Sequence, residues 1–277
     1  MAHARTGLRD LPWRRTRDPW AVLVSEVMLQ QTQARRVIPH WHAFLEAFPT
    51  VAACAAAPQA SVVARWQGLG YNRRAVSLHR TARAVVDQHG GRFPDTEPGL
   101  RSLPGIGPYT ARAVLAFAFE QPVGVLDVNA GRVLARAVAG VPLALSEAQA
   151  LSDRLCPPGD AWSWNQAMLD LGAIWCLRPE PRCLTCPVRA ACRWNAQGGP
   201  DPARGSAGES GRQSPFQGSH RQGRGRLVRS LTRGPVDREG LTAACGWPDD
   251  AAAAQRAAEG LVRDGIACWD DGRLRLR

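Results

Sequence analysis

The chain has 277 residues, a formal net charge of +11 and an apolar fraction of 45%, so it is long enough for two modest domains with a buried core. No segment near the N-terminus has the apolar core of a signal peptide, and no run reaches the roughly 18 apolar residues of a membrane span. We therefore expect a cytoplasmic protein. The positive charge favours nucleic acid as partner, although every Lys/Arg position is arginine, and an arginine-rich codon usage is the alternative explanation.

The apolar pattern predicts an all-α fold through residue 197, with no strand indicated in that region. Residues 18–46 predict a helix that is interrupted near Pro39, with Asp18 as the N-cap and Pro19 at the first helical position. Residues 100–119 predict a helix, a turn bracketed by glycines and a second helix. The other predicted helices cover residues 58–68, 73–89, 146–155 and 161–175.

The composition changes after residue 197. Residues 198–225 are rich in Gly, Ser, Pro and Arg, which predicts a disordered linker. Residues 226–277 predict three short helices and a β-hairpin that turns at Asp271-Gly272. This is the outline of a small winged-helix-like tail.

Four cysteines form a compact motif, C-x6-C-x2-C-x5-C, within residues 176–192. Disulfides are not expected in a reducing compartment, so the motif indicates a metal site. Structural zinc sites usually pair two C-x2-4-C units across a longer gap. The short loop therefore favours a [4Fe-4S] cluster, with zinc as the alternative. The four ligands would be Cys176, Cys183, Cys186 and Cys192.

The turn LPGIG at residues 103–107 lies between two predicted helices. Gly105 and Gly107 allow a close approach of the backbone, and their N–H groups near a helix N-terminus can bind a phosphate. Such a contact reads no base edge, so it is independent of DNA sequence. Taken alone, the same motif also fits an ordinary tight turn.

These features together resemble the endonuclease III superfamily of DNA glycosylases, which carry a helix-hairpin-helix and a cysteine-bound cluster. Within it, the sequence is similar to the adenine DNA glycosylase (MutY-type) family over residues 9–195. The motifs that carry this similarity are LPWR at 11–14, SEVMLQQTQ at 25–33, WQGLGYNRR at 66–74, VLDVN at 125–129 and NQAMLDLGA at 165–173. The resemblance implies a monomeric enzyme that removes adenine mispaired with 8-oxoguanine, or with guanine, from double-stranded DNA.

The resemblance also implies a domain layout. An N-terminal segment, 1–12, would pack on the cluster domain, and a six-helix barrel domain would span 13–125, with the helix-hairpin-helix at 100–119. A [4Fe-4S] cluster domain would follow at 126–197, then the linker at 198–225 and the winged-helix-like tail at 226–277.

Two carboxylic acids are the expected catalytic groups. Glu26 lies among apolar residues of a predicted helix, an environment that raises the pKa of a carboxyl and keeps it protonated. The resemblance makes it the general acid toward N7 of adenine. Asp127 would stabilise the positive charge that develops on the sugar, although it is also a plausible N-cap for the helix that follows. Asn129 would orient the reacting groups.

Tyr109 distinguishes between subclasses of this superfamily. Bifunctional relatives carry a lysine at this hairpin position, and its amine attacks the sugar and leads to strand cleavage. Tyrosine has no such amine, and the chain contains no lysine at all. The resemblance therefore implies a monofunctional glycosylase that uses water and leaves an abasic site.

The base must leave the helical stack to be cut. By resemblance, Gln31 and Tyr71 are wedge residues that hold the gap open, with Gln30 beside them. Other positions match the adenine pocket, namely Trp13, Arg14, Leu29 and Gln166. Without the motifs, Trp13 and Leu29 are equally consistent with core residues, and the two glutamines with solvated ones.

The sequence departs from the family at both ends. Only ten residues precede Leu11, and the tail is too short and too helical for the Nudix-like domain that reads 8-oxoguanine in many members. Two other functions remain open. One is a thymine glycosylase of the same fold acting at G:T mispairs, and the other is a non-catalytic iron–sulfur DNA-binding sensor.

Overall fold

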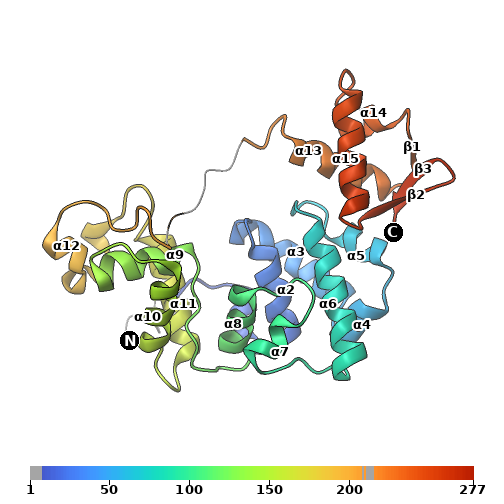
Figure 1. Ribbon diagram of the computed structural model, residues 1–277. Helices are drawn as coiled ribbons and strands as arrows, with labels where there is room; N and C mark the ends of the chain where they lie inside the picture. Colours follow the sequence, from blue (N-terminus) through green and yellow to red (C-terminus); the bar gives the residue numbers. More distant parts are fainter. Residues whose placement is uncertain (1–7, 208, 210–214) are drawn as a thin grey trace. The chain divides into compact units, whose positions relative to one another are not determined.

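The computed structural model describes residues 8–207, 209 and 215–277, and these are predominantly helical, as expected (Figure 1). The chain divides into two compact units. One takes in the chain up to residue 22, residues 95–98 and residues 107–212; the other takes in residues 23–94, 99–106 and 213–277. Parts of the expected N-terminal segment and linker, residues 1–7, 208 and 210–214, lie outside the described residues. Within the described part, no helix is long and apolar enough to cross a membrane.

Helices of the second unit surround an aromatic core. The elements are α3 (Ala34–Ala47), α4 (Val51–Ala56), α5 (Gln59–Arg65) and α6 (Arg73–His89), while α2 (Pro19–Leu29) and α7 (Glu97–Arg101) cross the boundary between units. Trp66 and Phe44 are fully buried and meet edge to face at 5.9 Å between ring centroids, a favoured aromatic geometry. Helix α4 was not predicted; Thr50 caps it by accepting a hydrogen bond from the Ala53 amide at 3.1 Å.

The predicted helix over residues 18–46 is two helices, and the predicted position of its interruption was wrong. Pro39 lies inside α3, and the break lies between Leu29 and Ala34. Gln31 there has a left-handed backbone with φ of 55°, which no α-helix accommodates. The break therefore comes from a turn that contains no proline.

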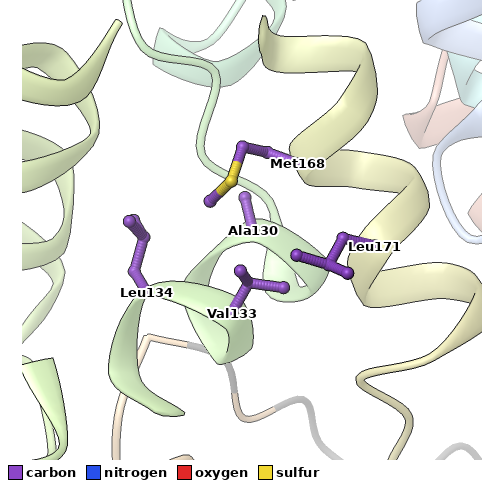
Figure 2. Packing of buried hydrophobic residues seen from close by; sticks show 5 residues of the cluster. All are labelled: Ala130, Val133, Leu134, Met168 and Leu171. Atoms are coloured by element: carbon purple, nitrogen blue, oxygen red, sulfur yellow. The ribbon is translucent and has the colours of Figure 1, made fainter. Parts of the chain in front are cut away.

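The first unit is built around the packing of α9 (Val128–Val133) on α11 (Ala161–Ile174). Figure 2 shows the apolar cluster between them, made of Ala130, Val133, Leu134, Met168 and Leu171, all less than a tenth exposed. The other elements are η1 (Pro12–Arg15), α8 (Pro108–Phe117), η2 (Leu134–Ala139), α10 (Leu145–Leu155), η3 (Cys183–Thr185), η4 (Arg189–Ala191) and α12 (Arg193–Gln197). This packing places the N-terminal end of α9 and the cysteine loop in one unit.

The expected boundary at residue 125 differs from the observed division, because residues 107–125 belong with the chain that follows. Helix α8 packs on α11. Arg112 also forms a bidentate ion pair with Asp153 on α10, with both N···O distances at 2.9 Å. These long-range contacts assign α8 to the first unit.

Residues 220–276 form a small group of helices and strands (Figure 1). Helices α13 (His220–Leu231), α14 (Leu241–Cys245) and α15 (Ala251–Arg263) accompany β1 (Val236–Asp237), β2 (Ala267–Asp270) and β3 (Arg273–Leu276). The antiparallel sheet has the order β1-β3-β2. The hairpin turns at Asp271 and Gly272, both with positive φ, as the sequence predicts.

Two features of this region were not predicted. The short strand β1 pairs Val236 with Leu274. Helix α13 begins at His220, inside the range expected for the linker. Ser219 caps it by accepting from the Gln222 amide, and Leu227 and Val228 are fully buried on its inner face. The cap at Ser219 therefore starts the helix inside the range that composition alone assigns to a linker, and the apolar burial that follows it stabilises the helix.

Candidate active site

Glu26 lies on α2 and is only 4% exposed. Its helical neighbours Leu23, Val27 and Met28 are buried apolar side chains. The burial of Glu26 among these side chains agrees with the apolar surroundings expected from the sequence. Removing a carboxyl from water favours its protonated form, which is the form that a general acid requires.

The two expected wedge residues share an unusual backbone. Gln31 has φ of 55° and Tyr71 has φ of 47°. Left-handed backbone at non-glycine residues costs on the order of 1 kcal/mol and concentrates at functional sites. Tyr71 is 39% exposed, and its hydroxyl accepts a hydrogen bond from Arg221 Nη1 at 2.8 Å. Both backbones are therefore held in a conformation that the residues do not themselves prefer.

Arg74 connects the loops that carry these residues, and sequence reasoning did not single it out. Its Nη1 donates to the carbonyl oxygens of Val27, Met28 and Gln30 at 2.7–3.0 Å. Its Nη2 donates to the Gly70 carbonyl at 3.1 Å. A cation at the C-terminal end of α2 is also favoured by the helix dipole. Burial lowers the pKa of Arg74 to about 10, so it stays charged at neutral pH.

A cavity of about 480 Å³ brings several expected DNA-binding residues together. Gln30, Gln31, Tyr71 and Gly105 all line it. At Gly105, φ is 80° and a Cβ atom would lie 2.7 Å from the Cβ of Ser77, so only glycine fits this hairpin turn. Gly107 caps α8. Tyr109 is the second residue of that helix and is partly buried.

Asp127 caps the N-terminus of α9. Its Oδ1 accepts from the amides of Asn129 and Ala130 at 2.8 Å each, and its Oδ2 accepts from Asn129 Nδ2 at 2.6 Å. Burial raises the pKa of Asp127 above 3.8, against the effect of these hydrogen bonds and of nearby Arg132. The N-cap role that the sequence allowed for Asp127 is therefore observed, and the capping carboxyl is also shielded from water.

Arg132 links Asn129 to the cysteine loop. Its Nη2 donates to Asn129 Oδ1 at 2.7 Å and to the Gly172 carbonyl at 2.9 Å. Its Nε donates to the carbonyl of Cys176 at 3.1 Å. A Cβ at Gly172 would lie 2.6 Å from the Asn129 carbonyl oxygen, so this glycine allows α11 to approach α9. No pattern in the sequence marks Arg132 beyond its place in helix α9.

Asn165 is a third residue that sequence reasoning did not single out. Its Oδ1 accepts from the Val125 amide at 2.8 Å, and its Nδ2 donates to the Val123 carbonyl at 2.9 Å. The side chain is 1% exposed. Asn165 thereby fixes the extended segment that leads into Asp127.

Residues expected at the adenine pocket are largely buried. Trp13 is 6% exposed and Gln166 5%, while Leu29 is partly buried. Arg14 forms a bidentate ion pair with Asp170 at 2.7 and 2.8 Å. Its Nη1 also donates to the carbonyl of Arg9. The terminal nitrogens of Arg14 are thus used to hold η1 against α11.

The four cysteines of the motif line one small cavity. Its wall also includes Arg136 and Trp194. Arg136 Nη1 donates to Cys176 Sγ at 3.5 Å. Within residues 8–207, 209 and 215–277, no group of three His, Cys, Asp or Glu is placed to hold a single metal ion.

Comparison with known proteins assigns the family. The model of the HhH-GPD superfamily of base excision DNA repair proteins matches residues 24–157. The adenine DNA glycosylase of Mycolicibacterium smegmatis is 40% identical over 282 residues, which covers 99% of this chain and 92% of that protein. The chain belongs to the adenine DNA glycosylase family.

Other members of the adenine DNA glycosylase family give the same assignment. The Mycobacterium tuberculosis H37Rv protein is 40% identical, with 97% of this chain and 89% of that protein covered. The human protein is 41% identical over 199 residues, with 67% of this chain and 36% of that protein covered.

Solved structures support the fold. A thermostable thymine-DNA glycosylase has a TM-score of 0.65 and 29% identity, covering 70% of this chain and 92% of its own. A non-covalent endonuclease III–DNA complex has a TM-score of 0.61 and 20% identity, covering 70% and 91%. At that identity, the second match shows only that the fold is shared.

Proposed function

We propose that this protein is a monofunctional glycosylase that hydrolyses the N-glycosidic bond of adenine opposite 8-oxoguanine or guanine in double-stranded DNA. The observation that carries the proposal is the match to adenine DNA glycosylases over 99% of the chain. The matched superfamily range, 24–157, contains Glu26, Tyr109 and Asp127. The thymine-DNA glycosylase match, at 29% identity, makes G:T mispairs the second candidate substrate.

Glu26 is the proposed general acid. Adenine is a poor leaving group when neutral, so a proton must reach N7 as the bond breaks. The burial of Glu26 supports this role, because removing a carboxyl from water in general favours its protonated form. Positioned proton transfer of this kind contributes about 10²–10⁴-fold to a rate.

Asp127 is the proposed stabiliser of the sugar cation. Its Oδ1 is held by two backbone amides and its Oδ2 by Asn129. A carboxylate fixed in this way needs no reorganisation when positive charge develops beside it. Asn129 is in turn held by Arg132, which supports its proposed role as the residue that orients Asp127.

Water is the proposed final nucleophile. Tyr109 stands at the hairpin position where a lysine would act, and the chain has no lysine elsewhere. A phenol cannot form the Schiff base that strand cleavage requires. The expected product is an abasic site in an intact strand.

The cavity lined by Gln31, Tyr71 and Gly105 supports a role in holding the distorted duplex. Side chains that fill the space left by an extruded base offset part of the cost of unstacking. Gly105 and Gly107 would bind backbone phosphate through their amides. Trp13, Leu29 and Gln166 are proposed to contact the adenine, and Arg14 to support that pocket through Asp170.

A [4Fe-4S] cluster is the proposed cofactor, held by Cys176, Cys183, Cys186 and Cys192. All four line one cavity with apolar and arginine side chains, which fits a thiolate-bound cluster shielded from water. When bound, the cluster would tie together the loop that carries these cysteines. Arg132 contacts the Cys176 carbonyl on one side and Asn129 on the other, so an ordered loop would also support Asp127.

Excision under single-turnover conditions tests the proposal. The duplexes should carry adenine opposite 8-oxoguanine, guanine or thymine, together with a G:T mispair, and products should be resolved before and after alkali. We expect adenine release opposite 8-oxoguanine and guanine, with strand breaks only after alkali. Release of thymine alone would favour the second candidate, and no release of any base would favour a non-catalytic DNA sensor.

A further inference from the structure

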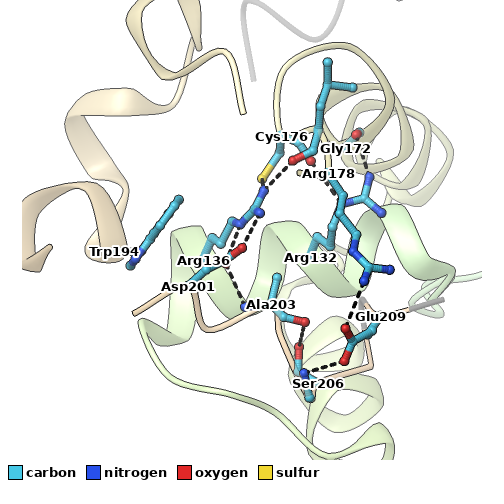
Figure 3. A network of polar contacts seen from close by, with 12 residues as sticks. Arg132, Arg136, Gly172, Cys176, Arg178, Trp194, Asp201, Ala203, Ser206 and Glu209 are labelled. Atoms are coloured by element: carbon cyan, nitrogen blue, oxygen red, sulfur yellow. Dashed lines mark hydrogen bonds and ion pairs between the residues drawn. The ribbon is translucent and has the colours of Figure 1, made fainter. Parts of the chain in front are cut away.

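A buried arginine, Arg136, lies directly beside one of the four cysteines. Its side chain is 1% exposed, and Nη1 donates to Cys176 Sγ at 3.5 Å and to the Leu177 carbonyl at 2.8 Å. The guanidinium also lies over the ring of Trp194, 5.1 Å from its centroid. Figure 3 shows the guanidinium directed at the Cys176 sulfur.

The partner of this cation comes from beyond the cysteine motif. Asp201 accepts from Nε of Arg136 at 2.8 Å and from Nη2 at 2.6 Å (Figure 3). This bidentate pair fixes the plane of the guanidinium and so directs Nη1 at the sulfur. A buried cation is stable only when it is paired, so the position of Arg136 depends on Asp201.

Residues 201–207, here called the latch segment, are fixed to the unit at several points. Asp201 Oδ1 also accepts from the Ala203 amide at 3.0 Å. Ala203 and Ser206 are buried, and the Ala207 amide donates to the Leu143 carbonyl at 3.0 Å. The latch segment is therefore packed against the unit, although its composition predicts a linker.

We propose that the latch segment retains and tunes the cluster, with Asp201 as a positioning residue that holds Arg136 against Cys176. The inference rests on the cluster of the proposed function. A charge-assisted N–H···S contact draws electron density from a ligating sulfur, and such contacts set both the affinity and the reduction potential of a cluster. The sequence motif ends at Cys192, whereas the supporting structure extends to residue 207.

The first experiment compares Asp201→Asn with Asp249→Asn in the full-length protein. Both variants replace an aspartate by asparagine, but Asp249 is exposed and lies outside the cysteine motif and the latch segment. Iron content and visible absorption of wild type are measured first, followed by the rate of iron release to a chelator. We expect Asp201→Asn to lose iron about 10-fold faster or more, and Asp249→Asn to match wild type.

A second measurement separates tuning from simple loss of packing. Arg136→Met removes both the positive charge and the hydrogen bond, and each change disfavours the more negative, reduced cluster. We expect a shift to a lower reduction potential by voltammetry, while Asp249→Asn keeps the wild-type potential. If Arg136→Met does not fold, the rate of iron release from Asp201→Asn decides whether the pair of Asp201 and Arg136 retains the cluster.

The outcomes distinguish this inference from the proposed function. Wild-type protein that binds no iron after anaerobic reconstitution would overturn both the cofactor assignment and the latch. Wild-type protein with a normal cluster, but equal rates of iron release in the two amide variants, would overturn the latch alone. Neither readout depends on base excision, so loss of glycosylase activity does not affect the conclusion.

Discussion

At the scale of single residues, opposing effects act on the pKa of the Asp127 carboxyl. Burial raises its pKa above 3.8, while two amides, Asn129 and Arg132 act to lower it. Its folded-state pKa lies above the unfolded value, so the native state binds an extra proton between the two. The contribution of this carboxyl to the free energy of unfolding is therefore fully present at pH values below its pKa in the unfolded chain. It is lost as the pH rises through its pKa in the folded protein.

Asp127→Asn tests this description of the carboxyl. Relative to wild type, the variant should gain stability as pH rises from 3.8 to neutrality, because asparagine does not ionise. Adenine excision should fall by about 10²-fold or more, since the fixed negative charge is gone. Urea unfolding across this pH range and single-turnover assays measure the two effects. A stability difference that does not vary with pH would contradict the raised pKa.

Asp170 is the opposite case. Burial alone would raise its pKa, but hydrogen bonds and charge from Arg14 and Arg9 hold it below 3.8. Its contribution to stability is present above the unfolded pKa and is lost only as pH falls through the lower folded value. The pair with Arg14 is 2.7 Å long, with side-chain exposures of 6% and 3%.

Asp170→Asn should therefore lower the free energy of unfolding at neutral pH by about 3–5 kcal/mol, because it leaves the buried cation of Arg14 without its partner. The matched control is Asp10→Asn, which breaks an exposed pair with Arg15 and should cost about 1 kcal/mol or less. Chemical denaturation measures both. Equal effects in the two variants would show that the buried pair is not what anchors η1.

Sequence patterns indicate some residues of the candidate site but not others. Glu26 and Asp127 lie in motifs whose local surroundings already favour a buried carboxyl and an N-cap. Arg132, Arg74 and Asn165 act on carbonyls and amides 40 or more positions away in the chain. Nothing local in the sequence marks such partners, so only the fold identifies these three residues.

At the scale of elements, the turn between α2 and α3 depends on Arg74. Arg74→Met should remove its hydrogen bonds to the end of α2 and to Gly70, lowering the free energy of unfolding by about 2–4 kcal/mol. The affinity for a mispaired duplex should also fall, because the loops that carry Gln31 and Tyr71 lose the hydrogen bonds of Arg74. Denaturation and DNA-binding titrations measure the two consequences.

The exposed neighbour Arg73 provides the control for that change. Arg73→Met removes the same charge but should alter stability by no more than about 0.5 kcal/mol. If the two variants were equally stable, the hydrogen bonds of Arg74 would not determine the turn. The prediction that placed this break near Pro39 was wrong because one proline within a helix is tolerated when the surrounding packing holds.

At the scale of the whole molecule, periodicity and composition predicted the all-α class, most helices and the C-terminal hairpin. They did not predict where the units divide. Residues 107–125 belong with the later chain because α8 packs on α11 and Arg112 pairs with Asp153. Likewise, the latch segment is ordered by Arg136, a partner 65 positions earlier. Both features depend on contacts that a linear pattern does not contain.

The central claim concerns the proton donated by Glu26, and Glu26→Gln tests it most directly. The measurement is single-turnover release of adenine opposite 8-oxoguanine, with Glu46→Gln on the exposed face of α3 as the matched control. We predict that Glu26→Gln binds the duplex as wild type does but excises adenine about 10²–10⁴-fold more slowly, while Glu46→Gln is unchanged. Excision by Glu26→Gln at the wild-type rate would contradict the account.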